Sequence, residues 1–459
     1  MINNRFIGRK EEQKVINNEL DSERFSAVLI YGRRRIGKTE LITNCINSRK
    51  KEDIIFFTAA KTIYEENINR FSQYISDYYN VNYSFNNLNS ILSYITEKSK
   101  ENKTILIIDE YSYLKQENSI IDSDMQKFID SNSNNSNLKL ILSGSIVDIM
   151  KNLIDGNEPL YGRFSAIISL SPFNYYEAAE FMNNRTNEEK FELYSVFGGV
   201  PHYLKLIDER LSVKDNIINL FFSRNNVMES EIEILLNSEL SKIETANTVL
   251  SAIGNSSLSY KEINQKIGKN SNGAAYILNK LVSMDIIRKE INIQKEDSNK
   301  GLYYINDNAL LFYYTFVLPN RNRTQFMSPE TIYSELVEQQ LYTNYLPKQF
   351  EKVCMEYLIK QNIRNKIKPP FYSIGRLTYH DPKTDLNHEY DIVTKDKNGY
   401  IYYECKYINT PVDEETVNNT ILNADNSSFN FYSYGFFSRN GYKKKKSSIA
   451  MYALDDLYL

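Results

Sequence analysis

The eight residues GRRRIGKT, Gly32–Thr39, match the spacing G-x-x-x-x-G-K-[ST]. They follow the apolar run AVLIYG, Ala27–Gly32, and precede a stretch of helical character. Glycines at the two fixed positions let backbone amides close around phosphate oxygens, the lysine reaches the β- and γ-phosphates, and the threonine hydroxyl ligates Mg²⁺. The following helix directs the positive end of its dipole at the same anion. The stretch therefore predicts a loop that binds ATP, with Mg²⁺ as the accompanying cofactor.

We expect Lys38 to be the catalytic cation of this loop and Thr39 to be a metal ligand. The whole expected nucleotide-contacting stretch comprises Gly32, Arg33, Arg34, Arg35, Ile36, Gly37, Lys38, Thr39 and Glu40.

A second strand supplies the carboxylates that such a loop needs. The run TILIIDE ends in Asp109 and Glu110. Asp109 is expected to hold Mg²⁺ through water, and Glu110 to orient and polarise the hydrolytic water. The next strand, LKLILSGS, places Ser143 and Ser145 where a hydroxyl senses the γ-phosphate.

Five apolar runs of strand length indicate the fold of the first 170 residues or so. They lack the in-and-out alternation of half-exposed strands, so they suit a parallel sheet that is covered by helices on both faces. Separated by helix-length segments, they predict a doubly wound α/β domain. The runs are Ala27–Gly32, Asp53–Ala60, Thr104–Glu110, Leu138–Ser145 and Ala166–Ser171.

Helical periodicity and the positions of prolines divide the rest of the chain into segments. Helical character continues to about residue 244, and the next segment has the order of three helices and a hairpin that is typical of a winged helix. Prolines bound the polar stretch Pro319–Pro329, which reads as a linker. We therefore expect a P-loop domain (1–172), a helical lid (173–244), a winged helix (245–318), a linker (319–333) and a C-terminal α/β domain (334–459).

Composition excludes several classes of protein. The net charge is −3 in 459 residues, so any DNA contact must come from a local patch. Three cysteines without regular spacing exclude a disulfide scaffold and favour a reducing, cytoplasmic location. The first residues lack a signal pattern and no run reaches membrane-spanning length, so no membrane partner is expected.

Taken in order, several motifs resemble the archaeal-type ATPase family, of the STAND branch of the AAA+ superclass. These motifs are FIGRKEE, GRRRIGKT, ILIIDEYSYL, LKLILSGS, PLYGRF and GGVPHYL, followed by the winged helix. The resemblance implies that Phe6–Arg9, with Arg9 as a contact, lie near the adenine and that Pro201 caps the nucleotide from the lid. It makes Arg163 the candidate arginine finger or sensor, with a surface arginine as the alternative.

The C-terminal domain resembles the PD-(D/E)xK restriction-endonuclease-like companion domain of such ATPases. Asp391 lies in EYDIV, and Glu404 and Lys406 lie in YECKY, on two runs that would pair across a DKNG turn. Alternation places Glu404 and Lys406 on one strand face. The resemblance implies that Asp391 and Glu404 share Mg²⁺ and that Lys406 stabilises or activates the attacking hydroxide. Glu351 is a further candidate ligand from the preceding helix, with a solvated helix charge as the alternative.

These expectations describe an ATP-binding, slowly hydrolysing switch ATPase that couples its nucleotide state to a metal-dependent, nuclease-like DNA-processing domain. The alternative is an ATP-gated regulator or scaffold whose last domain binds protein or nucleic acid without cleavage. DNA contacts are expected through the winged helix and the C-terminal domain, although protein packing is as good an interpretation of the winged helix. Lys443–Lys446 have two interpretations, a phosphate contact or a solvated helix start. The sequence leaves open whether a homo-oligomer supplies an arginine.

Overall fold

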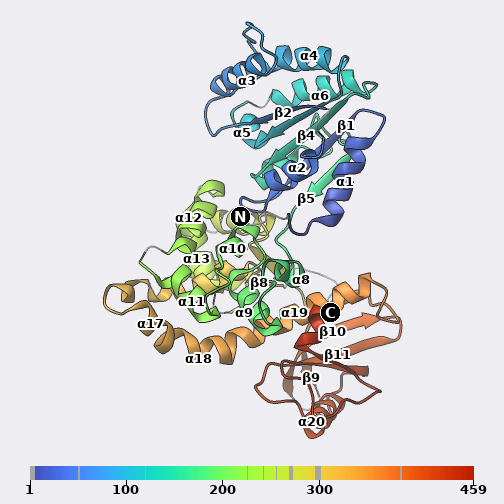
Figure 1. The fold of residues 1–459 in the computed structure, drawn as a ribbon. Helices are drawn as coiled ribbons and strands as arrows, with labels where there is room; N and C mark the ends of the chain where they lie inside the picture. The colour runs from blue at the N-terminus through green and yellow to red at the C-terminus, as the bar shows by residue number, and fades with distance from the viewer. Residues whose placement is uncertain are drawn as a thin grey trace. The chain divides into compact units, whose positions relative to one another are not determined.

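The computed structural model describes nearly the whole chain, as two compact units, 1–172 and 173–459 (Figure 1). The residues described are 6–49, 52–118, 120–224, 226–240, 242–254, 256–267, 272–294, 301–382 and 385–459.

The first unit is built on a five-stranded parallel sheet in the order β2-β3-β4-β1-β5. This confirms the predicted α/β fold. The five strands lie within or just beside the five predicted runs, at β1 Ser26–Tyr31, β2 Asp53–Thr58, β3 Thr104–Asp109, β4 Leu138–Gly144 and β5 Ala166–Ser169. The β1, β3 and β4 strands are buried along their whole length, which explains why their sequences are continuously apolar.

Helices cover both faces of this sheet. One apolar cluster joins α1 and α2 to alternate residues of the strands, such as Val28 and Ile30. A second cluster joins α3 to α7 to the residues in between, such as Leu29 and Leu106. The helices are α1 Lys10–Asp21, α2 Lys38–Ile46, α3 Tyr64–Tyr78, α4 Leu88–Ser99, α5 Tyr111–Glu117, α6 Ile121–Asn132 and α7 Val147–Asn152.

The second unit begins with helices, as predicted for residues 173–244. They are α8 Tyr175–Ala178, α9 Asn187–Phe197, α10 Pro201–Leu206, α11 Val213–Ile217 and α12 Val227–Glu239, with a 3₁₀ turn at Ala179–Phe181 and a π-helical turn at Ile218–Phe222. The Gly198–Gly199 interruption has a steric cause. A Cβ at Gly199 would lie 1.7 Å from the carbonyl oxygen of Phe173, so only glycine allows this close approach.

Three helices and a hairpin follow, in the order that the sequence predicts. The segments are α13 Ile243–Ile253, β6 Leu258–Ser259, α14 Tyr260–Ile267, α15 Asn272–Ser283, β7 Ile287–Glu290 and β8 Leu302–Ile305, with the sheet order β6-β8-β7. Most of the polar turn between β7 and β8, residues 295–300, lies outside the described residues.

The C-terminal part is a second five-stranded sheet, in the order β13-β12-β11-β10-β9. The β10 strand pairs antiparallel with β9 and with β11, whereas β12 and β13 continue the sheet parallel to β11. The long helix α19 precedes it. The bounds are α19 Leu346–Ile363, β9 Ser373–Asp381, β10 Leu386–Asp396, β11 Gly399–Lys406, α20 Glu414–Asp425, β12 Phe431–Ser438, β13 Ala450–Ala453 and a final 3₁₀ turn Leu454–Tyr458.

The segment expected to be a linker, residues 319–333, is helical and partly buried. It lies within a longer helical run that comprises α16 Asn308–Phe312, π-helical Tyr313–Val317, 3₁₀ Leu318–Gln325, α17 Pro329–Ile332, π-helical Tyr333–Val337, α18 Glu338–Gln340 and π-helical Leu341–Tyr345. Ile332 and Tyr333 belong to a single cluster of buried apolar side chains whose members range in the sequence from Phe173 to Leu457. The sequence of this segment is rich in proline and polar residues. Its few buried apolar side chains therefore do not stand out in the sequence, although they anchor the segment to the core.

The hairpin of the winged helix contacts the C-terminal sheet. The Ile293 amide donates to the Arg376 carbonyl at 3.3 Å, and the Asn292 side chain donates to the Thr378 carbonyl at 2.5 Å. Both acceptors lie on β9, the edge strand of the sheet. The wing therefore covers part of an edge that the sheet leaves open.

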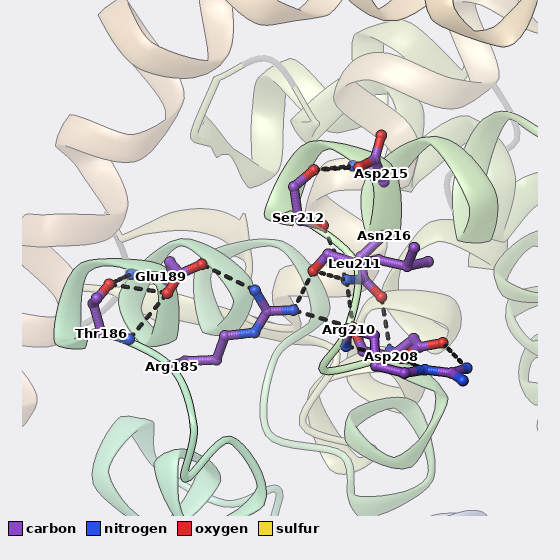
Figure 2. Close-up of polar contacts among 9 residues, drawn as sticks. All are labelled: Arg185, Thr186, Glu189, Asp208, Arg210, Leu211, Ser212, Asp215 and Asn216. Atoms are coloured by element: carbon purple, nitrogen blue, oxygen red, sulfur yellow. Dashed lines mark hydrogen bonds and ion pairs between the residues drawn. The ribbon is translucent and has the colours of Figure 1, made fainter.

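Polar contacts fix the loop after α10 (Figure 2). The Asn216 amide nitrogen donates to the carbonyls of Asp208 and Ser212, both at 3.0 Å, and its oxygen accepts from the Asp208 amide at 2.8 Å. Arg185 donates to the Asp208 carbonyl at 3.1 Å and to the Leu211 carbonyl. The buried Asn216 and the half-buried Arg185 thus provide hydrogen-bond partners for backbone groups of a loop without regular structure.

We predict that Asn216→Ala destabilises the second unit by roughly 2 kcal/mol, because it leaves buried backbone groups without partners. Asn216 is 1% exposed, so water cannot replace the lost bonds. The measurement is the shift of the urea unfolding midpoint. Arg210→Ala is the control, since its ion pair with Asp208 is solvent-exposed and its loss should leave the midpoint unchanged. Equal shifts for both variants would contradict the prediction.

Candidate functional site

The strand order gathers the predicted phosphate-binding residues at one edge of the first sheet. In a parallel sheet all strands end at the same edge, and helix α2 starts there with Lys38 directly after the loop that leaves β1. The β4 strand lies between β1 and β3. Residues that follow these three strands therefore converge, although they are up to about a hundred positions apart in sequence.

The loop has the backbone that its glycines allow. Gly37 has φ +90° and Arg35 has φ +70°, so both lie in the left-handed region. A Cβ at Gly32 would lie 2.5 Å from the Leu170 carbonyl oxygen. The buried Lys38 ammonium donates to the carbonyls of Gly32, at 2.8 Å, and Arg33, at 3.3 Å. The lysine is thus folded across the loop where phosphates would bind.

Asp109 is the centre of the polar cluster at this edge. Its Oδ2 accepts from the Thr39 hydroxyl at 2.8 Å, and its Oδ1 accepts from the Ser143 hydroxyl and from the Glu110 amide. A carboxylate and two hydroxyls are the hard oxygen donors that Mg²⁺ prefers. The residues therefore fit Mg²⁺, which Thr39 and Asp109 would hold. The structure brings Thr39, Asp109 and Ser143 together as the sequence predicts, with Ser143 contacting the carboxylate.

Glu110 is held beside this cluster by the end of β4. Its Oε2 accepts from the Ser145 hydroxyl at 2.6 Å and from the Ser145 amide at 3.1 Å. Its own backbone is left-handed, with φ +55°, which turns the side chain away from the line of β3. Ser145 was predicted only as a phosphate sensor, and sequence spacing gave no sign that it would bind the carboxylate.

Other predicted nucleotide contacts surround the loop. Arg9 is 6% exposed, and its guanidinium donates to the Ser171 carbonyl at 2.6 Å, just beyond the end of β5. Arg33 and Ile36 are buried, whereas Arg34, Arg35, Thr39 and Glu40 are exposed at the loop surface. Arg9 therefore lies at the same sheet edge as the phosphate loop, in keeping with the expected position near the base.

Arg163 lies at the opposite edge of the sheet. The Ser165 amide donates to the Ala27 carbonyl at the beginning of β1, and the Arg163 guanidinium binds Asp130 at 2.8 and 3.0 Å. The arginine precedes β5, whereas the phosphate loop follows β1. Arg163 consequently does not reach the phosphate loop of its own chain, which corrects its expected role there, and a finger role would require a second copy.

Pro201 belongs to the second unit, where it is the buried first residue of α10. Its expected contact with the nucleotide stays a prediction.

Comparison with known proteins gives the family. A family model described as an ATPase domain predominantly from Archaea matches residues 6–207. An uncharacterized protein of Methanocaldococcus jannaschii is 30% identical over 385 residues, which is 83% of each chain. The chain belongs to this family of archaeal ATPases. A second model, described as archaeal and bacterial proteins of unknown function, matches residues 313–420 of the ATPase.

Solved structures similar to the ATPase include the Walker-type ATPase of Pyrococcus abyssi, with 20% identity and a TM-score of 0.49 over 67% of this chain and 96% of that one. The ORC2 protein of Aeropyrum pernix has 13% identity and a TM-score of 0.46, over 70% of this chain and 97% of that one. In the described part of the ATPase, no helix is long and apolar enough to cross a lipid bilayer.

The C-terminal hairpin of the ATPase places its predicted site residues close together. Pairing of Ile392 with Tyr403, continued by one residue, sets Asp391 opposite Glu404. Asp391 accepts from the Cys405 amide at 3.3 Å, and the Lys406 ammonium binds the Glu404 carboxylate. Burial, together with the charge of Glu404, raises the pKa of Asp391 to about 6. Glu404 and Lys406 also line a hollow of about 240 Å³ under α20.

Glu351 is held by an arginine that sequence analysis did not single out. Arg376, on β9, binds Glu351 at 2.6 Å and Glu389 at 2.8 Å. Burial and the nearby charge of Asp391 raise the pKa of Glu351 to about 7. The IGR stretch that contains Arg376 was visible in the sequence, but nothing in its spacing indicates that it clamps two acids.

The metal-ligand role expected of Glu351, Asp391 and Glu404 stays a prediction. No three His, Cys, Asp or Glu side chains of the described residues come together as a metal-binding group. Lys406 and Arg376 neutralise Glu404 and Glu351 instead. Glu404 and Glu351 are thus ion-paired, whereas Asp391 accepts a hydrogen bond from a backbone amide.

We predict that Ser145→Ala raises basal ATP hydrolysis roughly tenfold, because a charged hydrogen bond that restrains Glu110 is lost. ATP affinity should stay unchanged, since Ser145 is not part of the loop. The measurement is steady-state phosphate release, with nucleotide binding followed separately. Ser165→Ala, which changes a serine at the far sheet edge, is the control. A fall in the hydrolysis rate for Ser145→Ala would show that Ser145 positions Glu110 productively.

Proposed function

We propose that this ATPase is a slow, ATP-gated switch. The observation that carries the proposal is the Asp109 cluster, in which Thr39 and Ser143 converge on one carboxylate beside the phosphate loop. Lys38 would neutralise the β- and γ-phosphates, and Mg²⁺, held by Thr39 and Asp109, would add charge stabilisation there. Hydrolysis needs Glu110 to orient a water. The hydrogen bonds from Ser145 restrain one oxygen of the Glu110 carboxylate, which supports a low basal rate.

The test of this function uses two variants. Lys38→Ala should weaken Mg·ATP binding at least ~30-fold, because a phosphate loses its charged partner. Glu110→Gln should keep binding and lower hydrolysis ~100-fold or more, because the amide cannot accept a proton from water. Calorimetry measures the first effect and phosphate release the second. Lys127→Ala changes an exposed lysine of α6 and serves as the control. Wild-type turnover by Lys38→Ala would refute the assignment.

The C-terminal domain is best supported as a binding end that does not cleave. The nuclease interpretation has support in Asp391 facing Glu404, with Lys406 two residues further along the same strand. Against it, Arg376 and Lys406 form ion pairs with Glu351 and Glu404. In addition, no three His, Cys, Asp or Glu side chains of the described residues come together as a metal-binding group. Each ion pair balances its carboxylate from within the domain, where a buried charge without a partner would be costly. The nucleotide state would then control what this end binds.

Plasmid nicking distinguishes the two interpretations. With Mg²⁺ or Mn²⁺, with and without ATP, we expect the wild type and Asp391→Ala to leave supercoiled plasmid equally intact. Agarose gels of the relaxed and linear forms are the measurement. Cleavage by the wild type that Asp391→Ala abolishes would instead establish the nuclease.

A further inference from the structure

The connection between α19 and β9 carries an unusual run of charge. From Tyr357 to His380 the chain has five basic residues and no Asp or Glu. Three of them, Arg364, Lys366 and Lys368, are exposed. None of these three forms an ion pair with any described residue. The connection is therefore a local cationic surface on a chain whose net charge is −3.

The cations lie close enough to influence one another. The pKa of Lys360, one turn earlier on α19, is lowered to about 8, first by burial and then by the charges of Arg364 and Lys366. Glu177 is the acid that opposes this effect at Lys360. Like charges held at such short range gain free energy when a polyanion neutralises them.

The loop is ordered before any ligand arrives. The Asn362 side chain donates to the Phe371 carbonyl at 2.8 Å and accepts from the Phe371 amide at 3.1 Å, which closes residues 363–370 into a compact turn. The Lys366 amide donates to the Gln361 carbonyl at 2.9 Å. Binding would therefore cost little loop entropy.

Exposed apolar surface flanks the charges. Tyr372 is 67% exposed and Ile363 is 75% exposed. The Tyr372 amide donates to the Lys395 carbonyl of β10 at 3.0 Å, so the backbone that carries the exposed ring is fixed next to the basic turn. An accessible aromatic ring among cations is the combination that holds unpaired bases, which stack on the ring while the phosphates meet the charges.

Two other basic candidates on the second unit lack these properties. Each of Lys443, Lys444, Lys445 and Lys446 lies within 4 Å of a carboxylate of Asp413, Glu414 or Asp456. On α15, the helix that reads DNA in many winged helices, Lys280 is buried, and Tyr276 and Val282 are exposed. Among its described side chains, residues 274–283, no cation is exposed.

We propose that Arg364, Lys366, Lys368 and Tyr372 form a binding surface for single-stranded nucleic acid. This inference rests on the proposed function in one respect, that the C-terminal domain is a binding end. An anionic membrane is the less suitable occupant, because membrane-surface segments need a broad apolar face and this loop offers one aliphatic side chain.

The test is fluorescence anisotropy of full-length protein with a labelled oligothymidine of about 20 nucleotides. The charge variant R364Q/K366Q/K368Q should bind ~100-fold more weakly at about 0.1 M salt, and its log-log salt dependence should flatten by about 2, for three lost phosphate contacts. Tyr372→Ala should weaken binding of the oligothymidine roughly tenfold and leave duplex binding unchanged.

Matched controls separate this effect from net charge. K443Q/K444Q/K445Q removes the same charge from paired lysines and should change the affinity less than ~3-fold. The charge-conserving R364K/K366R/K368R should bind like the wild type. Equal losses for the two glutamine variants would overturn the proposal, as would equal affinity for duplex with no effect of Tyr372→Ala. Patch-dependent binding to phosphatidylserine vesicles without oligonucleotide binding would overturn it in favour of a membrane.

The oligonucleotide-binding result does not depend on whether the protein is an ATP-gated switch. ATP binding by each patch variant should match the wild type, which also verifies folding. If Lys38→Ala fails to affect ATP binding while the patch variants lose the oligonucleotide, the ATPase assignment fails and the surface stands.

Discussion

The strand order of the first sheet is the constraint on which the site depends. Because β4 lies between β1 and β3, the Ser143 hydroxyl near its end and the Thr39 hydroxyl after β1 both reach the carboxylate at the end of β3. The buried, continuously apolar strands hold the three ends in register, so packing in the core fixes the geometry of polar groups at the rim.

Sequence alone predicts the parts of this site that depend on local spacing. The loop, the helix after it and the two acids after β3 follow from motifs and apolar runs, and the structure places them as predicted. Arg163 shows where such reasoning ends, because a motif does not reveal at which edge of a sheet its residues emerge. The contact of Ser145 with Glu110 likewise depends on strand order, which apolar runs do not encode.

The second unit shows a different limit. Composition divides it at a polar, proline-bounded segment, yet one apolar core joins the helices, the winged helix and the last sheet. Buried residues such as Ile332 are too few in that segment to produce a recognisable pattern. In the last sheet the hairpin register was predictable from its turn, whereas Arg376 acts through contacts between distant elements. Ion pairs between such distant elements neutralise acids that lie close together. Residue spacing in the sequence does not predict these pairs.

The contact between the wing and β9 has a practical consequence for dissecting the protein. Asn292 and Ile293 satisfy carbonyl groups of a strand that would otherwise present its backbone to solvent. A fragment that begins after the winged helix would uncover that backbone, and bare strand edges pair with one another between molecules. The last sheet is therefore better isolated together with its winged helix, because the fragment alone is prone to self-association and precipitation.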